Sequence, residues 1–490
     1  EGERIMKTGG KFLKILIFAL TLCAALAITA AAADTVKSGT CGENLIWTLD
    51  DEGVLTISGS GIMENYVYDE LGGSSAPWYS YSENIESVMI KNGVKTIGNY
   101  AFLDCKKLDD ISIPSSVVSI GEYAFWDCTG LGSVVIPDGV VTIYDGAFYQ
   151  CQGLTDVVIP NSVTSIGKFS FSYCSSLGSI TIPDSVTSIE DGVFMSCTGL
   201  KNVIIPNSVV RIGENAFDNC DGLTSIVIPD SVATIGEFAF SSCSGLTSVT
   251  IPDGVVAIER YTFHFCTALT RVNIPNSVVT IGDSAFGDCE SLTSIAIPKS
   301  VTFIGWGAFS ECTGLRSISI PNSVITIDEY AFSRCDGLTS ITIPGSVTTI
   351  GEGAFNYCSG CRILEITSST TDIGSRAFGH WTTGDSLSII FRGTKAEYEQ
   401  VKDLLPSTRN VSFYENDSSR FIYNDNGSYF AIASEGVGYV QDDTASSITI
   451  GGREYAYSRQ SDIVSLPGMF SRQYVLYSLD SADEVCSVEG

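Results

Sequence analysis

Apolar and polar residues alternate along this chain in a pattern that repeats every 23 residues. In the unit that begins at Pro160, apolar side chains stand 3, 6, 11, 14, 17, 20 and 22 residues after the proline. The order Leu-x-x-Ile-x-Ile at 177–182 predicts a short strand with one buried face, and Val-x-x-Ile at 163–166 predicts a second extended piece. The i, i+3 spacing of Phe171 and Cys174 predicts one helical turn between them.

The period holds without a slip through most of the chain. Eleven of the 14 prolines keep it between residues 114 and 344, as do 12 of the 16 cysteines between 105 and 358 and 13 phenylalanines between 102 and 378. Units of this size cannot bury their apolar faces alone, so they stack on one another. We therefore predict a repeat solenoid of about 13 coils, with a parallel β-strand and a short helical turn in each coil and β-rich caps at both ends.

The segments on either side of the repeats have the composition of caps, which cover the apolar face and strand edge of the end coils. Residues 45–57 fit a hairpin turned at 50–53, and Thr394 can cap a helix over 395–405. The predicted organisation is a signal peptide at 1–33, an N-terminal β cap at 34–84, the solenoid at 85–381, a strand-helix-strand cap at 382–414 and a small β-rich module at 415–490.

The N-terminus has the features of a secretory signal. Lys7, Lys11 and Lys14 precede an apolar run at 15–28, and Ala31–Ala33 offers a small-residue cleavage site. We expect a secreted or cell-surface protein with no membrane insertion after cleavage. Two alternatives remain open, namely an uncleaved anchor over 15–33 and a lipoprotein signal that ends at Cys23.

Composition and motifs argue against several function classes. The formal charge of −29 disfavours nucleic acid, which clustered Lys and Arg bind. The two histidines, His264 and His380, lie about five coils apart, and no Gly-rich phosphate loop is present, so we predict no enzyme and no cofactor. The Asp residues that follow several prolines lack the Gly-rich nonapeptide of calcium-binding solenoids, so no metal site is expected either.

The periodic cysteines would form a ladder with one side chain in each coil. Parallel Cβ vectors are the wrong geometry for disulfides, so we expect buried thiols that pack as small apolar groups. Cys358 and Cys361 form one CxxC at the end of the ladder, which leaves open a local disulfide or two buried thiols.

Candidate binding residues gather where the repeats vary. The outward strand positions are mostly Thr, Ser, Gly and Ala, whereas positions 8, 9, 12 and 13 after each proline differ between coils. Rigid rings beside acids suit protein or sugar recognition, but they could instead pack on one another or on the N-terminal cap. The candidates in the early coils are Tyr100, Tyr123, Trp126, Asp127, Tyr144, Asp145, Tyr149, Phe169 and Tyr173, followed by a second group of Tyr261, His264 and Phe265 and a separate Trp306.

The repeat Leu-x-x-Ile-x-Ile-Pro-x-Ser-Val-x-x-Ile-Gly-x-x-Ala-Phe-x-x-Cys resembles the BspA-like leucine-rich repeat family of bacterial surface proteins over residues 85–381. Residues 41–61 are similar to the leader of such arrays, and 389–405 to their closing segment. The resemblance implies an exported, non-catalytic solenoid for adhesion or recognition of a host or neighbouring-cell protein or glycan. The alternative is a rigid stalk that presents the C-terminal module. The chain departs from the general leucine-rich pattern where an Asn ladder is expected and has Ser231, Gly254 and Ser277 instead.

Overall fold

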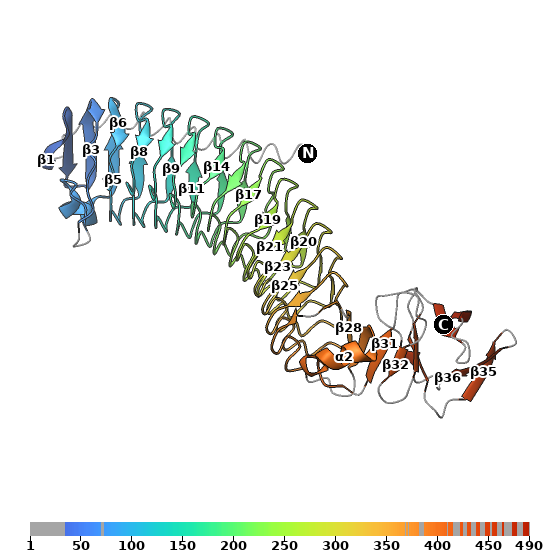
Figure 1. Ribbon diagram of the computed structural model, residues 1–490. Helices are drawn as coiled ribbons and strands as arrows, with labels where there is room; N and C mark the ends of the chain where they lie inside the picture. Colours follow the sequence, from blue (N-terminus) through green and yellow to red (C-terminus); the bar gives the residue numbers. More distant parts are fainter. Residues whose placement is uncertain are drawn as a thin grey trace.

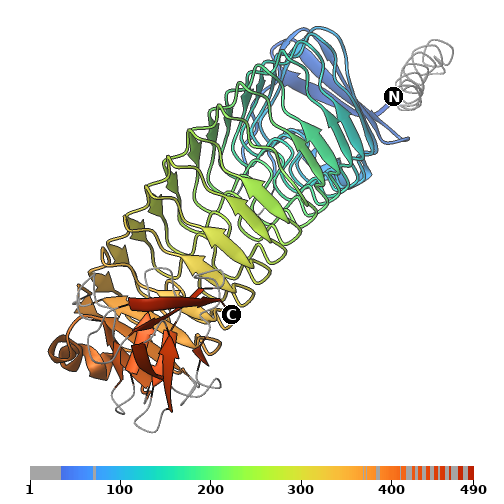
Figure 2. The same ribbon diagram turned by 90° about the vertical axis from the view of Figure 1, so that its right-hand side faces the viewer.

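The computed structural model describes residues 35–69, 73–367, 369–370, 372–381, 387–408 and 410–414, and further strands between 422 and 489. The predicted signal peptide at 1–33 and the side chains of the predicted module at 415–490 lie outside the described residues. The repeats form one curved row of coils (Figure 1). Seen from the side, the coils are a stack of similar loops with their strands aligned (Figure 2). The predicted solenoid of about 13 coils is confirmed.

Most coils contribute a first strand that follows the conserved leucine. Its middle residue is buried and its two neighbours face outward, as in β13, where Ile180 is buried. Strands of successive coils pair in parallel at a step of 23 residues, for example Ile180 with Val203. The first series comprises β5 (Ser87–Ile90), β7 (Asp110–Ser112), β9 (Ser133–Val135), β11 (Asp156–Val158), β13 (Ser179–Thr181), β15 (Asn202–Ile204), β18 (Ser248–Thr250), β20 (Arg271–Asn273), β22 (Ser294–Ala296), β24 (Ser317–Ser319), β26 (Ser340–Thr342) and β28 (Ile363–Thr367).

A second, shorter strand follows the proline turn of each coil. The proline carbonyl accepts a hydrogen bond from the N–H of the valine three residues later, as in Pro160 and Val163, and this turn separates the two strands. The second series comprises β6 (Val94–Ile97), β8 (Ser119–Ile120), β10 (Thr142–Ile143), β12 (Ser165–Ile166), β14 (Ser188–Ile189), β16 (Arg211–Ile212), β17 (Thr234–Ile235), β19 (Ala257–Ile258), β21 (Thr280–Ile281), β23 (Phe303–Ile304), β25 (Thr326–Ile327), β27 (Thr349–Ile350) and β29 (Asp372–Ile373).

At the position where the leucine-rich pattern expects an Asn ladder, the structure has a serine ladder. The Ser231 hydroxyl donates to the Val209 carbonyl of the preceding coil at 2.7 Å, and Ser277 makes the equivalent bond to Val255 at 2.6 Å. At Gly254 a side chain would not fit easily, because a Cβ would lie 2.9 Å from a backbone carbonyl oxygen of the preceding coil. Both residue types are therefore compatible with this turn. Serine stabilises it by a hydrogen bond to the preceding coil, and glycine avoids a close contact with that coil because it has no side chain.

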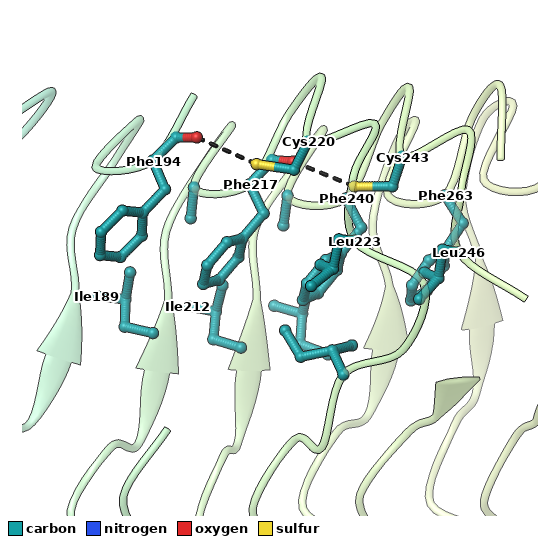
Figure 3. Packing of buried hydrophobic residues seen from close by; sticks show 14 of the residues in the cluster. Ile189, Phe194, Ile212, Phe217, Cys220, Leu223, Phe240, Cys243, Leu246 and Phe263 are labelled. Atoms are coloured by element: carbon teal, nitrogen blue, oxygen red, sulfur yellow. Dashed lines mark hydrogen bonds between the residues drawn. The ribbon is translucent and has the colours of Figure 1, made fainter. Parts of the chain in front are cut away.

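The core is a spine of stacked phenylalanines. Successive rings from Phe102 to Phe378 lie 5.1–5.9 Å apart, nearly parallel, with the conserved Leu and Ile side chains beside them (Figure 3). Both ends of the spine are covered by tryptophans. Trp78 stacks on the first ring at 5.9 Å, and Trp381 meets the last ring edge-on at 5.7 Å.

Each ladder cysteine after the first also donates a hydrogen bond within the core. The Cys220 thiol, for example, donates to the Phe194 carbonyl of the preceding coil at 3.2 Å (Figure 3). Trp381 stands 23 residues after Cys358, and its indole N–H makes the same type of bond to the Phe355 carbonyl at 2.6 Å. In the last coil, the Trp381 indole therefore replaces the cysteine thiol as hydrogen-bond donor, and its larger ring covers the end of the phenylalanine spine.

The N-terminal end of the array is covered by an antiparallel sheet. β1 (Thr35–Gly42) pairs with β2 (Leu45–Asp50), which forms the predicted hairpin with β3 (Val54–Gly59). β3 in turn pairs in parallel with β5 and joins the array. The short β4 (Gly61–Ile62) pairs with β6, and a 3₁₀ helix, η1 (Tyr79–Asn84), follows Trp78.

At the other end, β28 pairs in parallel with β30 (Ser388–Arg392). After β30 the chain forms α2 (Lys395–Val401), η3 (Lys402–Leu404) and β31 (Asn410–Tyr414). Thr394 caps α2 as predicted, and together with Glu397 it forms a capping box. The predicted helix over 395–405 is an α-helix only to Val401 and continues as η3. β31 also pairs with the later strand β32. The later strands are β32 (Ile422–Asn424), β33 (Tyr429–Ile432), β34 (Gly438–Gln441), β35 (Ser446–Ile450), β36 (Arg453–Tyr457), β37 (Ile463–Val464), β38 (Gln473–Tyr477) and β39 (Glu484–Glu489).

Candidate functional site

The variable positions of the repeat lie on a turn that carries two left-handed residues in each coil. In the coil that contains Phe125 these are Tyr123 and Asp127, with φ of 49° and 60°. Their N–H groups donate to carbonyls of the next coil, at Asp145 and Tyr149, both at 2.9 Å. The predicted helical turn is therefore wrong. A right-handed helix cannot include left-handed residues, so the segment forms consecutive tight turns. Bonds within the coil close these turns, such as that from the Trp126 N–H to the Tyr123 carbonyl at 3.2 Å, and the left-handed residues bond to the next coil.

Five of the nine candidate residues come together as a row of rings. Tyr100 stacks on Tyr123 at 5.5 Å, Trp126 packs against Tyr123 and Tyr149 at 5.4 and 5.9 Å, and Tyr149 meets Tyr173 at 5.4 Å. All five side chains are partly exposed. Tyr68 of the N-terminal cap, a residue that the period does not include, completes the row, which we call the aromatic ridge: Tyr68, Tyr100, Tyr123, Trp126, Tyr149 and Tyr173.

The rings of the ridge thus pack on one another and on the cap, and they also keep polar atoms at the surface. The Trp126 indole donates to the Gln150 amide oxygen at 3.0 Å. Burial, followed by nearby tyrosines and carboxylates, raises the pKa of Tyr100, Tyr123 and Tyr149. These phenols therefore stay neutral at physiological pH and keep O–H donors for a partner.

The acidic candidates have partners within the array. Asp127 pairs with Lys106 at 3.0 Å, and Lys106 also meets Asp104 at 3.4 Å. The Asp145 carboxylate accepts the backbone N–H of Lys168 at 2.9 Å and so links two coils. Because such bonds occupy one carboxylate oxygen, Asp145 contributes to the stacking of the coils as well as to the surface charge.

The structure does not bring Tyr144 and Phe169 into the ridge. Tyr144 is 46% exposed. The Phe169 ring lies over Gly192 of the next coil, where an added Cβ would approach the ring to 2.3 Å. Tyr330 covers Gly353 in the same way, at 2.6 Å. A ring at position 9 followed by glycine in the next coil is therefore a packing pair, and Tyr123 of the ridge also covers such a glycine, Gly146, at 2.3 Å.

The second group of candidates forms a cluster of its own. Tyr261 stacks on Phe238 at 4.7 Å and meets His264 edge-on at 4.9 Å, while His264 contacts the Phe265 ring at 4.2 Å. The His264 Nε2 lies 3.2 Å from an Asp288 carboxylate oxygen. Trp306, predicted to be separate, packs against Tyr330 at 6.2 Å.

The cysteines of the described residues are free and buried, and this includes Cys358 and Cys361. Of the two alternatives for that CxxC, the structure has two thiols, and Cys361 donates to the Ile363 carbonyl at 3.1 Å. Burial raises the pKa of Cys197 and Cys312 to about 12. The thiolate is the reactive and metal-binding form, so these thiols are inert at neutral pH. In the described part of the chain, no three metal-ligating side chains are grouped.

The sequence reading missed one surface feature. The outward position two residues before each proline, expected to be Thr, Ser, Gly or Ala, is aliphatic and exposed at Val135, Val158, Ile204 and Val227. The signal lies in the sequence itself, which has Val, Val, Thr, Ile and Val at this position in five successive coils.

Comparison with known proteins places the repeats in context. The family model described as BspA type leucine rich repeat region (6 copies) matches residues 75–201, 187–306 and 279–394, more than half of the chain. A leucine-rich repeat protein from Bacteroides ovatus is 26% identical over 71% of this chain and 98% of its own, with a TM-score of 0.57. A leucine rich cell surface protein from Faecalibacterium prausnitzii is 29% identical over 76% of this chain and 98% of its own, with a TM-score of 0.47.

No curated protein matches the chain. Among the helices of the described residues, none has the length and apolar character that crossing a bilayer requires.

Proposed function

Because this chain belongs to the BspA type leucine-rich repeat family, we propose that it is an exported, non-catalytic recognition protein of a bacterial cell surface. The aromatic ridge is its contact surface for a host or neighbouring-cell protein or glycan. The observation that carries the proposal is the row of partly exposed rings built on left-handed turns. The packed rings lose little conformational entropy when a partner covers them, and such anchors dominate binding energies.

Burial and charge on the ridge support the same function. A solenoid that needs aromatic side chains only for its core has them in the phenylalanine spine already. The ridge rings are additional, partly exposed, and bordered by Glu122, Asp127 and Asp145, so they combine apolar area with acceptors for hydrogen bonds. Tyr and Trp of this kind are enriched in the parts of interfaces that contribute most to affinity.

The test compares two Trp–Tyr pairs whose rings are in contact, one in the ridge and one in later coils. Trp126→Ala with Tyr149→Ala removes the centre of the ridge, and Trp306→Ala with Tyr330→Ala removes a pair in later coils whose rings are 6.2 Å apart. Each full-length variant is titrated against immobilised matrix proteins and a glycan array. We expect the ridge variant to lose about 30-fold in affinity, as for a binding hot spot of about 2 kcal/mol, and the control to bind as the parent does.

The melting temperature of each variant shows whether a loss of binding comes from lost contacts with the partner or from disturbed packing of the array. If both double variants lower it equally but only the ridge variant loses binding, the ridge rings contact the partner. Equal loss of binding in both variants, or unchanged binding in the ridge variant, contradicts the proposal.

A rigid stalk is the second candidate function. It is favoured by the parallel pairing of β28, β30 and β31 and by the antiparallel pairing of β31 with β32, because one hydrogen-bonded sheet links the array to the C-terminal strands. Such a connection would hold the C-terminal strands in one orientation. Binding that survives the ridge substitutions but is lost when residues 415–490 are removed would favour the stalk.

A further inference from the structure

A row of exposed aliphatic side chains crosses the outer face of the first strand series in β9, β11 and β15 and continues to Val227, which has the same place in a coil whose segment is not a strand. Val135, Val158, Ile204 and Val227 are 62%, 50%, 52% and 79% exposed, and Thr181 stands between them. We call these five residues the aliphatic stripe. Val135 lies directly opposite Val158, and Thr181 directly opposite Ile204, so the members are neighbours along the solenoid. Single exposed aliphatic residues are ordinary, but a continuous row on one face indicates a contact surface.

The stripe is confined to part of the array. At the same position, the later coils carry small or polar residues, which are Thr250, Asn273, Ala296, Ser319 and Thr342. Other exposed aliphatic residues, such as Val256 and Val279, precede the second strand series and are separated from the stripe by the proline turn. The repeat itself therefore does not require aliphatic residues at the stripe.

Carboxylates line one side of the stripe. Asp138, Asp184 and Asp230 are exposed in the proline turns, three residues after Val135, Thr181 and Val227. The two intervening coils have the neutral residues Asn161 and Asn207 at this position. On the other side, the exposed Asp156 is balanced by Lys201. An occupant with basic side chains along one flank would be complementary to this rim.

The spacing of the coils favours a helical occupant. The paired strands that carry the stripe lie about 4.8 Å apart, and the rings of the spine beneath them are 5.1, 5.3, 5.9 and 5.4 Å apart from coil to coil. An α-helix that runs along the solenoid advances about 5.4 Å per turn and offers one apolar side chain to each coil. An extended strand places side chains on the same face about every 6.7 Å, so it loses register within a few coils.

We propose that the aliphatic stripe binds an amphipathic helix of a partner protein, which lies along the solenoid and carries Lys or Arg on one flank. About five turns, or roughly 18 residues, span the stripe. The apolar side chains of the helix pack between successive stripe residues, and its basic flank faces Asp138, Asp184 and Asp230. This surface is separate from the aromatic ridge, because it lies on the strands and the ridge lies on the left-handed turns.

The test uses a synthetic 18-residue peptide with Leu at the i, i+3, i+4 and i+7 positions and Lys on one flank, labelled for fluorescence anisotropy with the full chain. We expect saturable binding that weakens at high salt, since the rim is exposed to solvent. A peptide of the same composition with two central prolines, which break the helix, should not bind. Ile204→Ser with Val227→Ser should weaken binding at least tenfold, whereas Val256→Ser with Val279→Ser should change it less than twofold.

Several results would overturn the inference. These are absence of saturable binding, equal binding of the proline peptide, or equal losses in both double variants. A dimer seen by sedimentation that Ile204→Ser with Val227→Ser dissolves would show that a second copy covers the stripe, which also overturns it. Trp126→Ala should leave peptide binding unchanged, so failure here is distinguishable from failure of the proposed function.

Discussion

The thiol ladder predicts that the protein loses stability abruptly above pH 9. All 12 periodic cysteines, from Cys105 to Cys358, are buried. Burial raises their pKa in the folded state from the ordinary value of 9.0, to about 12 at Cys197 and Cys312. Between these values, an unfolded chain releases its thiol protons while the folded chain retains them. The stabilisation is therefore fully present below pH 9 and is lost as the pH rises toward 12.

The size of the effect follows from proton linkage. One proton of difference between the folded and unfolded states changes the free energy of unfolding by about 1.4 kcal/mol per pH unit. If the whole array unfolds together, its 12 ladder thiols give about 16 kcal/mol per pH unit. A stability of about 5–15 kcal/mol, typical of single domains, would be lost within roughly one unit above the unfolded pKa.

The assay is urea unfolding at pH 8, 9, 9.5 and 10 with a reductant, which prevents disulfides in the unfolded chain. Cys197→Ala should lower stability at pH 8 but make the pH dependence shallower by about 1.4 kcal/mol per unit, because one titrating group is gone. Val209→Ala, a buried truncation without a titrating group, should lower stability and leave the pH dependence unchanged. A urea midpoint that stays constant from pH 8 to 10 would refute the reasoning.

Two further predictions concern the ends and the turns of the array. Trp381→Phe should cost about 1 kcal/mol, because it keeps a ring but removes the N–H donor to the Phe355 carbonyl; hydrogen exchange should then speed up in the last coil, while Trp306→Phe should have no effect there. Gly192→Ala should cost about 1–3 kcal/mol in thermal unfolding, because its φ is +63° and its Cβ would meet the Phe169 ring. Phe169→Ser should recover part of this loss, and equal destabilisation with and without it would contradict the contact.

The spine of the fold could be predicted from the sequence because every coil repeats the same buried residues. Phe171 and Cys174 recur at one step, and only a stack of coils buries all of them. The left-handed turn could not be predicted so directly, because Tyr123 and Phe169 occupy conformations that favour glycine. The clue was the glycine at the same position in other coils, such as Gly146 and Gly192, which have φ of 61° and 63°.

The aromatic ridge includes one residue, Tyr68, that does not belong to the 23-residue repeat. Tyr68 lies in the segment that follows β4 and reaches Trp126, 5.2 Å away; the Tyr66 N–H of this segment donates to the Asn99 carbonyl and so ties it to the first coil. A repeat pattern predicts which residues share a column, since the step between coils is fixed. It does not predict which segment of a cap covers the end of that column, since the cap has its own sequence and turns.

The separation of core and surface within each coil explains how one array can carry two different contact surfaces. The buried Phe, Cys, Leu and Ile side chains determine the stack, and the turn is held by N–H and carbonyl groups that every residue other than proline has. The left-handed positions accept Tyr100, Asp104, Asn215 or Arg376 because the bonds between coils do not involve these side chains. The outward strand position likewise accepts Val227 or Ser319 over the same buried core. Substitution at either surface thus leaves the other unchanged, so the ridge and the stripe can acquire separate partners while the solenoid stays the same.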